Sequence, residues 1–188
     1  MRCFLALGLP EPLKGALWQL QEAFKGSQAD VKWVDRHHFH LTFCFFKKVE
    51  EEPLERWVRD LTITLKAFPP FRLELKGVGA FPTVDHPRVI WAGVVSTHPL
   101  NDLYREIRCS AEWDETIREE NRKGLPWKPH VTLGRVRPEG KTGSLTAYLK
   151  KIGETALGSF PASDLVVMES RLDRKGPLYT ERYQIRLK

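Results

Sequence analysis

The sequence contains few cysteines, and they lie far apart. Three occur among 188 residues, with no Cys-x-x-C motif, and they are Cys3, Cys44 and Cys109. An odd number at wide spacing fits neither a disulfide framework nor a zinc site built on thiolates. We therefore expect reduced thiols and a cytoplasmic location.

Long hydrophobic runs are also absent. Although 41% of the residues are hydrophobic, no apolar stretch approaches the roughly 20 residues that a membrane-spanning helix requires. The first ten residues, MRCFLALGLP, contain one basic residue and a short apolar stretch that ends at Pro10, which is not the pattern of a signal peptide. We expect a soluble protein without a membrane partner, and we interpret residues Phe4 to Leu9 as a strand.

No linker of low complexity divides the chain, and 188 residues suffice for one domain or for two small lobes that share a core. Apolar residues at helical spacing predict four helices, at about 11–25, 54–65, 100–113 and 145–152. Alternating residues predict strands between them, at about 31–34, 38–46, 71–76, 88–95, 165–172 and 179–187.

Pairs of predicted strands that resemble hairpins recur between the helices. This order favours an α+β fold with antiparallel sheets over a doubly wound parallel sheet. Each half of the chain also contains a helix and one copy of the motif described next. We therefore expect a single domain, residues 1–188, in which two pseudo-symmetric lobes of antiparallel sheet with outer helices surround a central cleft.

The clearest pattern in the chain is a His-x-Thr sequence that occurs twice, in HFHLTFCF and in KPHVTLGRV. Residues i and i+2 of a strand point to the same side, so His40 shares a face with Thr42 and His130 shares a face with Thr132. Apolar neighbours anchor the other face of each strand. If the two strands face each other across a cleft, two imidazoles and two hydroxyls meet in approximate twofold symmetry, which suits a tetrahedral phosphate.

Such a site can cleave a phosphate ester without a metal or another cofactor. With an ordinary pKa near 6.5, one imidazole can take a proton from water while the other gives one to the departing oxygen. The threonine hydroxyls can donate hydrogen bonds to the non-bridging oxygens. The structural alternative is two unrelated half-buried histidines, because six histidines and eleven threonines give about a third of one such match by chance.

Three histidines crowd together before and within the first motif. His37 should point away from His38 and His40, and no carboxylate or cysteine at suitable spacing completes a ligand set. We therefore expect no metal site. His38 either lines the cleft with His40 or lies exposed on the surface.

Four blocks of the sequence resemble a known family in the same order: WVDRHHFHLTFCF, GAFPTVDHPRVIWAGV, PWKPHVTLGRV and ESRLDRKGPLY. The family is that of the two-histidine (2H) phosphoesterases, specifically the RNA 2′,3′-cyclic phosphodiesterases once called 2′-5′ RNA ligases. The resemblance implies a bilobal fold and metal-independent hydrolysis of a terminal RNA 2′,3′-cyclic phosphate to a 2′-phosphate. It further implies that His40 donates a proton to the leaving 3′ oxygen, that His130 activates water, and that Thr42 and Thr132 contact the phosphate.

Arg135 matches the arginine that follows the second motif in this family, where it would help to neutralise the phosphate. Strict alternation from His130 places Arg135 on the opposite face of the strand, so the assignment requires a bulge or the end of the strand near Gly134. The same alternation in the first copy predicts Phe45 on the apolar face and Cys44 on the polar face.

A net charge of +6 favours a polyanionic partner. In the segment NRKGLPWKP, which we interpret as a loop, Arg122, Lys123 and Lys128 either receive an RNA backbone or form a solvated surface. We expect a monomer whose partner is RNA with a 2′,3′-cyclic phosphate end. Two other functions fit the same residues: reversible 2′-5′ RNA ligation at the same site, and RNA-end binding without catalysis.

Overall fold

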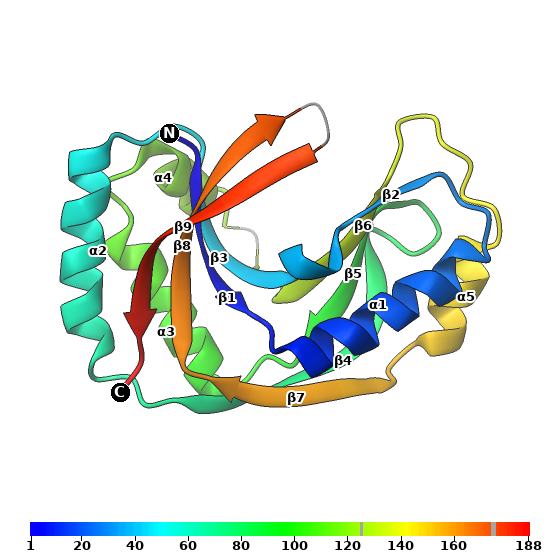
Figure 1. Cartoon of the computed structure of the whole chain (residues 1–188), viewed down its shortest axis with the longest axis horizontal. Helices are drawn as coiled ribbons and strands as arrows, with labels where there is room; N and C mark the ends of the chain where they lie inside the picture. Colours follow the sequence, from blue (N-terminus) through cyan, green and yellow to red (C-terminus); the bar gives the residue numbers. More distant parts are fainter. Residues whose placement is uncertain (125, 174–175) are drawn as a thin grey trace.

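The computed structural model describes residues 1–124, 126–173 and 176–188, and within them the strands form one nine-stranded antiparallel sheet (Figure 1). The strands are β1 (Cys3–Gly8), β2 (Val31–Trp33), β3 (His40–Phe46), β4 (Phe71–Pro82), β5 (Pro87–Val94), β6 (His130–Val136), β7 (Ala156–Ala162), β8 (Asp164–Asp173) and β9 (Gly176–Arg186). The helices are α1 (Glu11–Lys25), α2 (Glu51–Leu65), α3 (His98–Ser110), α4 (Glu115–Arg122) and α5 (Leu145–Ile152), with a 3₁₀ helix η1 (Arg36–His38). The predicted α+β class is confirmed.

The strand order of the sheet is nearly symmetric about its centre. The order is β7-β4-β5-β6-β3-β1-β8-β9, and β2 pairs with β6. The strands β6 and β3 are therefore central, with three strands outside each of them. In the described residues these two strands are bridged at the pair Leu41 and Val131. The two predicted lobes are thus the two halves of one continuous sheet, and the ladder that joins them, between β3 and β6, is short.

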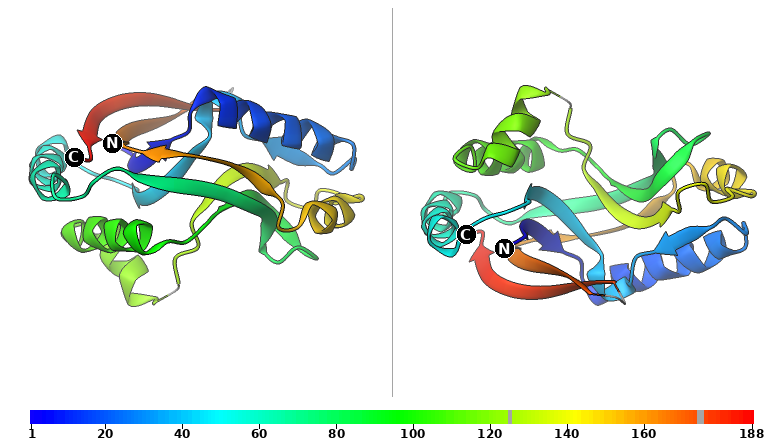
Figure 2. Two further views of the ribbon diagram at one scale, coloured as in Figure 1. Left: turned by 90° about the horizontal axis from the view of Figure 1, so that it is seen from below. Right: turned by 90° about the horizontal axis from the view of Figure 1, so that it is seen from above.

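Helices cover both faces and both ends of the sheet. Figure 2 shows α1 on one side and α3 with α4 on the other, while α2 and α5 lie at opposite ends of the long axis. Their apolar faces are buried as the helical spacing predicts; for example, Leu17, Leu61 and Leu103 are each fully buried. Complete burial of one such side chain contributes about 1.5–3 kcal/mol, so the packing of the helices stabilises the sheet that carries the central strands.

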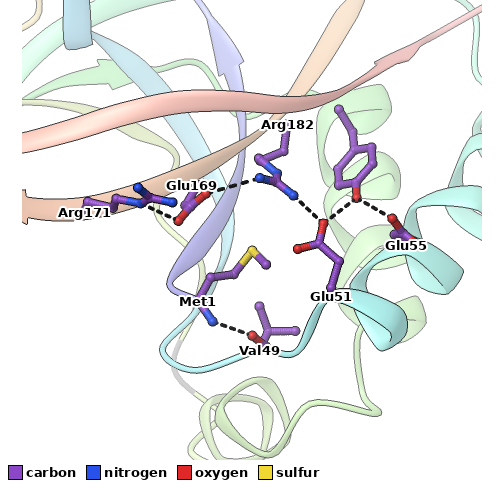
Figure 3. Close-up of polar contacts among 8 residues, drawn as sticks. Met1, Val49, Glu51, Glu55, Glu169, Arg171 and Arg182 are labelled. Carbon is purple, nitrogen blue, oxygen red and sulfur yellow. Dashed lines mark hydrogen bonds and ion pairs between the residues drawn. The ribbon is translucent and has the colours of Figure 1, made fainter.

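The amino-terminal end is fixed beside β8, β9 and α2 (Figure 3). The ammonium group of Met1 donates a hydrogen bond of 2.6 Å to the carbonyl oxygen of Val49. Arg182 of β9 lies 3.5 Å from the Glu169 carboxylate of β8 and also pairs with Glu51 at the start of α2. The hydrogen bond of Met1 ties the first residue of the chain to the segment before α2, and the ion pairs of Arg182 join β9 to β8 and α2.

Helix α4 is not predicted by the apolar pattern, because Ile117 is its one buried residue. The Asp114 carboxylate accepts a hydrogen bond of 3.2 Å from the Ile117 amide and so caps the first turn. The basic loop predicted from Asn121 onward therefore begins two residues later, since Arg122 ends the helix and Lys123 follows it. Leu125 of that segment lies outside the described residues.

The structure also contains η1 and β7, which the pattern does not predict. The Asp35 carboxylate accepts a hydrogen bond of 2.8 Å from the His37 amide and caps η1. This short helix ends at His38, so the strand that was expected to start there begins at His40. Within the described ranges, no helix is long and apolar enough to cross a membrane.

Candidate active site

The two His-x-Thr motifs lie side by side at the centre of the sheet. Their middle residues, Leu41 and Val131, are directly paired in the antiparallel ladder between β3 and β6. This register sets the histidine of each motif beside the threonine of the other motif. The motifs therefore meet, although as neighbours in one sheet and not as strands that face each other across a cleft.

One face of this central pair is core, and the other face opens into a cleft. Leu41 and Val131 are buried, so the histidines and threonines project from the opposite face. The cleft there has a volume of about 760 Å³. It is lined by the two histidines predicted to transfer protons, His40 and His130, and by the three residues predicted to bind the phosphate, Thr42, Thr132 and Arg135. The two histidines therefore belong to one site, which excludes the alternative of two unrelated half-buried histidines.

A β-bulge follows the threonine of the first motif. Two consecutive residues of β1 pair with Cys44 and Thr42, so Phe43 is an extra residue in β3. A bulge reverses the alternation of the residues that follow it. As a result Phe45 lines the cleft and Cys44 is buried, and both predictions from strict alternation are wrong.

A second bulge occurs at the same place in the other motif. Two consecutive residues of β5 pair with Gly134 and Thr132, so Leu133 is the extra residue in β6. Arg135 consequently reaches the cleft, and the bulge that its assignment requires is present. Gly134 allows this path, because a Cβ atom there would lie 2.8 Å from the indole ring of Trp33.

Each histidine is oriented by the backbone carbonyl two residues before it. The Nδ1 atom of His40 lies 2.7 Å from the oxygen of His38, and the Nδ1 atom of His130 lies 2.7 Å from the oxygen of Lys128. A carbonyl oxygen can only accept, so Nδ1 carries the proton in both rings. Neutral imidazoles held in this way keep Nε2 unprotonated and available for proton transfer.

Aromatic rings fix the planes of both imidazoles. His40 stacks on Phe4 with ring centroids 4.7 Å apart and meets the edge of Tyr179 at 5.9 Å. His130 meets Phe81 edge to face at 5.0 Å. Each imidazole is therefore half-buried against apolar rings on one side and open to the cleft on the other.

The pKa of both imidazoles lies below its ordinary value of 6.5, and burial is the largest cause in each case. The carbonyl hydrogen bonds partly oppose this shift. Positive charges lower the two pKa values further, but from different sources. For His40 they are the rings of His38 and His130 in their protonated form, whereas for His130 they are the Arg135 guanidinium and the Lys128 ammonium.

The three predicted RNA-backbone residues lie apart from the cleft. Arg122 and Lys123 are exposed at the end of α4 and are not among the described residues that line it. Lys128 also does not line it; its ammonium group lies 4.2 Å from the centroid of the Trp91 ring. Lys128 therefore acts on the site through its charge near His130.

Sequence reasoning missed several residues that line the cleft. Arg2 precedes the first strand and no pattern marks it, whereas Lys32 lies in a predicted strand and could have been assigned to either face. Tyr179 belongs to the block ESRLDRKGPLY, which is the one signal that could have identified it. His38, for which the sequence left both a cleft and a surface position open, lines the cleft, with its ring 4.6 Å from that of Tyr179.

The cysteines lie apart from this chemistry. All three are free thiols; Cys3 and Cys44 are buried and Cys109 is exposed. Burial raises the pKa of Cys3 to about 11 and that of Cys44 to about 12, so both stay protonated at neutral pH. In the part of the chain that the structure describes, no three His, Cys, Asp or Glu side chains are grouped as a metal ion would require.

Comparison with known proteins supports the resemblance of the sequence blocks. The model of the 2′-5′ RNA ligase superfamily matches residues 9–174. The chain is 30% identical over 187 residues to a Methanothermobacter thermautotrophicus protein named RNA 2′,3′-cyclic phosphodiesterase, covering 100% of this chain and 99% of that protein. It is 31% identical over 180 residues to a Methanocaldococcus jannaschii protein of the same name, covering 95% and 96%.

The fold has a close counterpart among solved structures. A crystal structure of a Thermus thermophilus protein matches with a TM-score of 0.82 and 28% sequence identity, covering 100% of this chain and 98% of that one. The similarity therefore extends over both halves of the sheet and includes both His-x-Thr strands.

Proposed function

The chain belongs to the 2′-5′ RNA ligase superfamily, and from this membership and the geometry of the cleft we propose that it hydrolyses RNA 2′,3′-cyclic phosphate ends to 2′-phosphate ends without a metal ion. The archaeal relatives carry the name of this activity. The observation that carries the proposal is the pairing of Leu41 with Val131, because it places both His-x-Thr motifs around one point.

In the proposed reaction His130 accepts a proton from water while the water oxygen attacks the phosphorus. The bond between phosphorus and the 3′ oxygen breaks, and His40 donates a proton to that oxygen. The product has a 2′-phosphate and a free 3′-hydroxyl. His130 is then protonated and His40 neutral, so proton exchange with solvent must restore both before the next turnover.

The surroundings of the two rings support this division of roles. A proton acceptor must be neutral when substrate binds, and the permanent charges of Arg135 and Lys128 favour the neutral form of His130. The positive charges that lower the pKa of His40 come from two other imidazoles, His38 and His130, and not from an arginine or a lysine. His40 can therefore take up a proton when an anionic phosphate lies beside it.

Thr42, Thr132 and Arg135 complete the proposed site around the phosphate. Each threonine lies next to the histidine of the other motif, where its hydroxyl can donate a hydrogen bond to a non-bridging oxygen. Arg135 offsets the negative charge that the phosphate carries. Acid-base catalysis contributes about 10²–10⁴-fold per group, and oriented donors to a developing oxyanion add about 10²–10³-fold each.

The proposal is tested with an oligoribonucleotide that ends in a 2′,3′-cyclic phosphate, incubated with the protein in excess EDTA. We expect the mass of one water to be added and phosphorus NMR to place the phosphate on the 2′ oxygen. A second RNA with a 5′-hydroxyl end, included in the same assay, reports any ligation. RNA that is bound but unchanged, or activity that EDTA abolishes and a divalent ion restores, would contradict the proposal.

A further inference from the structure

The cleft contains more positive charge than one cyclic phosphate needs. Arg2, Lys32 and Arg135 line it, and across residues 1–124, 126–173 and 176–188 no carboxylate forms an ion pair with any of them. Asp35, an acidic lining residue, is occupied as the cap of η1. A cyclic phosphate carries one negative charge, so once Arg135 has offset it the remaining cations can bind a further anion.

Arg2 lies against the residue of β3 that corresponds to Arg135 of β6, which is Phe45. Phe45 follows His40 by five positions, as Arg135 follows His130, and equivalent bulges bring both residues to the cleft. The guanidinium carbon of Arg2 lies 5.3 Å from the centroid of the Phe45 ring, a cation-π contact that restricts the arginine. The β6 side thus has a cation at this position, and the β3 side has a cation beside it.

Backbone contacts join Arg2 to the hairpin of β8 and β9. The amide of Ser170 donates a hydrogen bond of 2.8 Å to the carbonyl oxygen of Arg2, and Ser170 is paired with Tyr179. Burial raises the pKa of the Tyr179 phenol, and the charges of Arg135 and Arg2 partly oppose that rise. The phenol therefore lies within electrostatic reach of both guanidinium groups.

The same hairpin presents apolar side chains at the mouth of the cleft. Leu172, Pro177 and Leu178 all line it, and Leu172 and Leu178 are 72% and 56% exposed. In Figure 1 the hairpin, orange and red, projects beyond the rest of the sheet; positions 174 and 175 lie outside the described residues. Leu172 is two positions from Ser170 and opposite Pro177, so it shares the face of Tyr179.

We propose that Arg2, Tyr179 and Leu172 form a second nucleotide subsite, which binds the nucleotide that precedes the one carrying the cyclic phosphate. The Arg2 guanidinium pairs with the phosphodiester between these two nucleotides. The Tyr179 hydroxyl donates a hydrogen bond to the same phosphate, and the base of the preceding nucleotide lies against Leu172. The inference rests on the proposed function, because it takes the cyclic phosphate to lie between the two histidines.

Arg2 is a better candidate than Lys32 for this role. Lys32 is directly opposite Arg135 in the β2-β6 pair, so both charges act at the same side of the cleft. The Arg2 guanidinium is instead restricted by its contact with Phe45 and lies on the side of the cleft where the hairpin of β8 and β9 exposes apolar side chains. An RNA nucleotide has an anionic phosphate for the guanidinium and an apolar base face for these side chains.

The first test compares kcat/KM for a 2′,3′-cyclic mononucleotide and for an oligoribonucleotide with the same cyclic end. We expect Arg2→Gln to lower kcat/KM about tenfold for the oligoribonucleotide, the effect of losing one charged hydrogen bond, and less than about twofold for the mononucleotide. Arg2→Lys should recover most of the loss. The control is Arg59→Gln, which removes an equal charge from the exposed face of α2.

The second test measures binding and needs no turnover. For an oligoribonucleotide ending in a 2′-phosphate, the slope of log Kd against log salt should fall by about 0.7 in Arg2→Gln, as for one lost contact to a single strand. Leu172→Ser should weaken binding without changing the slope.

Equal losses for mononucleotide and oligoribonucleotide would assign Arg2 to the cyclic phosphate and overturn the subsite. An unchanged salt slope would overturn it as well. Failure of the proposed function looks different: the wild-type protein would hydrolyse neither substrate, while the binding measurement would still decide whether Arg2 contacts RNA.

Discussion

The β3 half and the β6 half of the cleft share a backbone plan but surround their histidines differently. Each strand starts at a histidine whose Nδ1 lies 2.7 Å from the carbonyl oxygen two residues earlier. Each has a bulge directly after its threonine. The fifth position after the histidine then differs, because it is Phe45 in one half and Arg135 in the other.

The imidazoles of His40 and His130 are chemically identical, but their surroundings give them different tendencies to take up a proton. His40 is packed against Phe4 and the edge of Tyr179, and its charged neighbours are other imidazoles. His130 has two permanent cations close by. A symmetric backbone can therefore hold one imidazole that gains a proton when an anion binds and another that stays neutral.

The largest expected effect comes from removing either histidine. His40→Ala and His130→Ala should each lower kcat/KM for the cyclic phosphate by up to about 10⁴-fold, because each variant lacks one proton-transfer group. His86→Ala, which removes an exposed loop histidine, should have no effect. Circular dichroism checks that all three fold. Near-normal turnover in either folded active-site variant would show that the histidine it lacks does not transfer a proton in the reaction.

Removing a threonine hydroxyl should cost less, and similar amounts in the two halves. Thr42→Val and Thr132→Val should each lower kcat by about 10²-fold through loss of one donor to the developing oxyanion. The matched control is Thr64→Val on the exposed face of α2. Full activity in the double valine variant would show that the threonines only shape the strands.

The second bulge can be tested through stability. Gly134→Ala places a Cβ atom 2.7 Å from Cγ1 of Val31 and 2.8 Å from the Trp33 ring, so the free energy of unfolding should fall by about 1–3 kcal/mol. The same change at Gly15, in α1 with no atom within 4 Å of a new Cβ, should raise stability by about 0.4–1 kcal/mol. Equal urea midpoints for the two variants would contradict the close packing at Gly134.

The smallest effect concerns pH. Because both imidazole pKa values are lowered, kcat/KM should be bell-shaped with its centre below about pH 6.5, the ordinary value. Arg135 lowers the pKa of His130, so Arg135→Gln should raise that pKa and move the acidic limb to higher pH. Arg59→Gln should leave the limb in place. A shift toward lower pH would contradict the assignment of the acceptor to the β6 half.

Much of this site could be predicted from the sequence, because its key residues obey local rules. The spacing of His and Thr fixes a shared face within each strand, and the family resemblance marked Arg135 together with the bulge it needs. Phe45 was misplaced since its bulge depends on the register with β1, which no local pattern records. Arg2 reaches the cleft through contacts with β8, distant in sequence.

The two elements that the sequence pattern does not predict, α4 and β7, were missed for physical reasons as well. Helix α4 is highly charged and buries Ile117 alone, so its apolar pattern is too weak to detect. Strand β7 buries Phe160 and Ala162 but contains Gly158 and Pro161, which disfavour strands in sequence-based reasoning. Both elements are stabilised by neighbours that the chain meets only once it has folded.

The unequal roles of the two halves can be tested most directly with a cyclic substrate in which sulfur replaces the 3′ oxygen, assayed in excess EDTA. A thiolate leaves without being protonated, so the proton donor becomes dispensable while the acceptor does not. We expect the sulfur substrate to restore most of the lost rate to His40→Ala and none of it to His130→Ala. Rescue of His130→Ala, or of neither variant, would contradict the account.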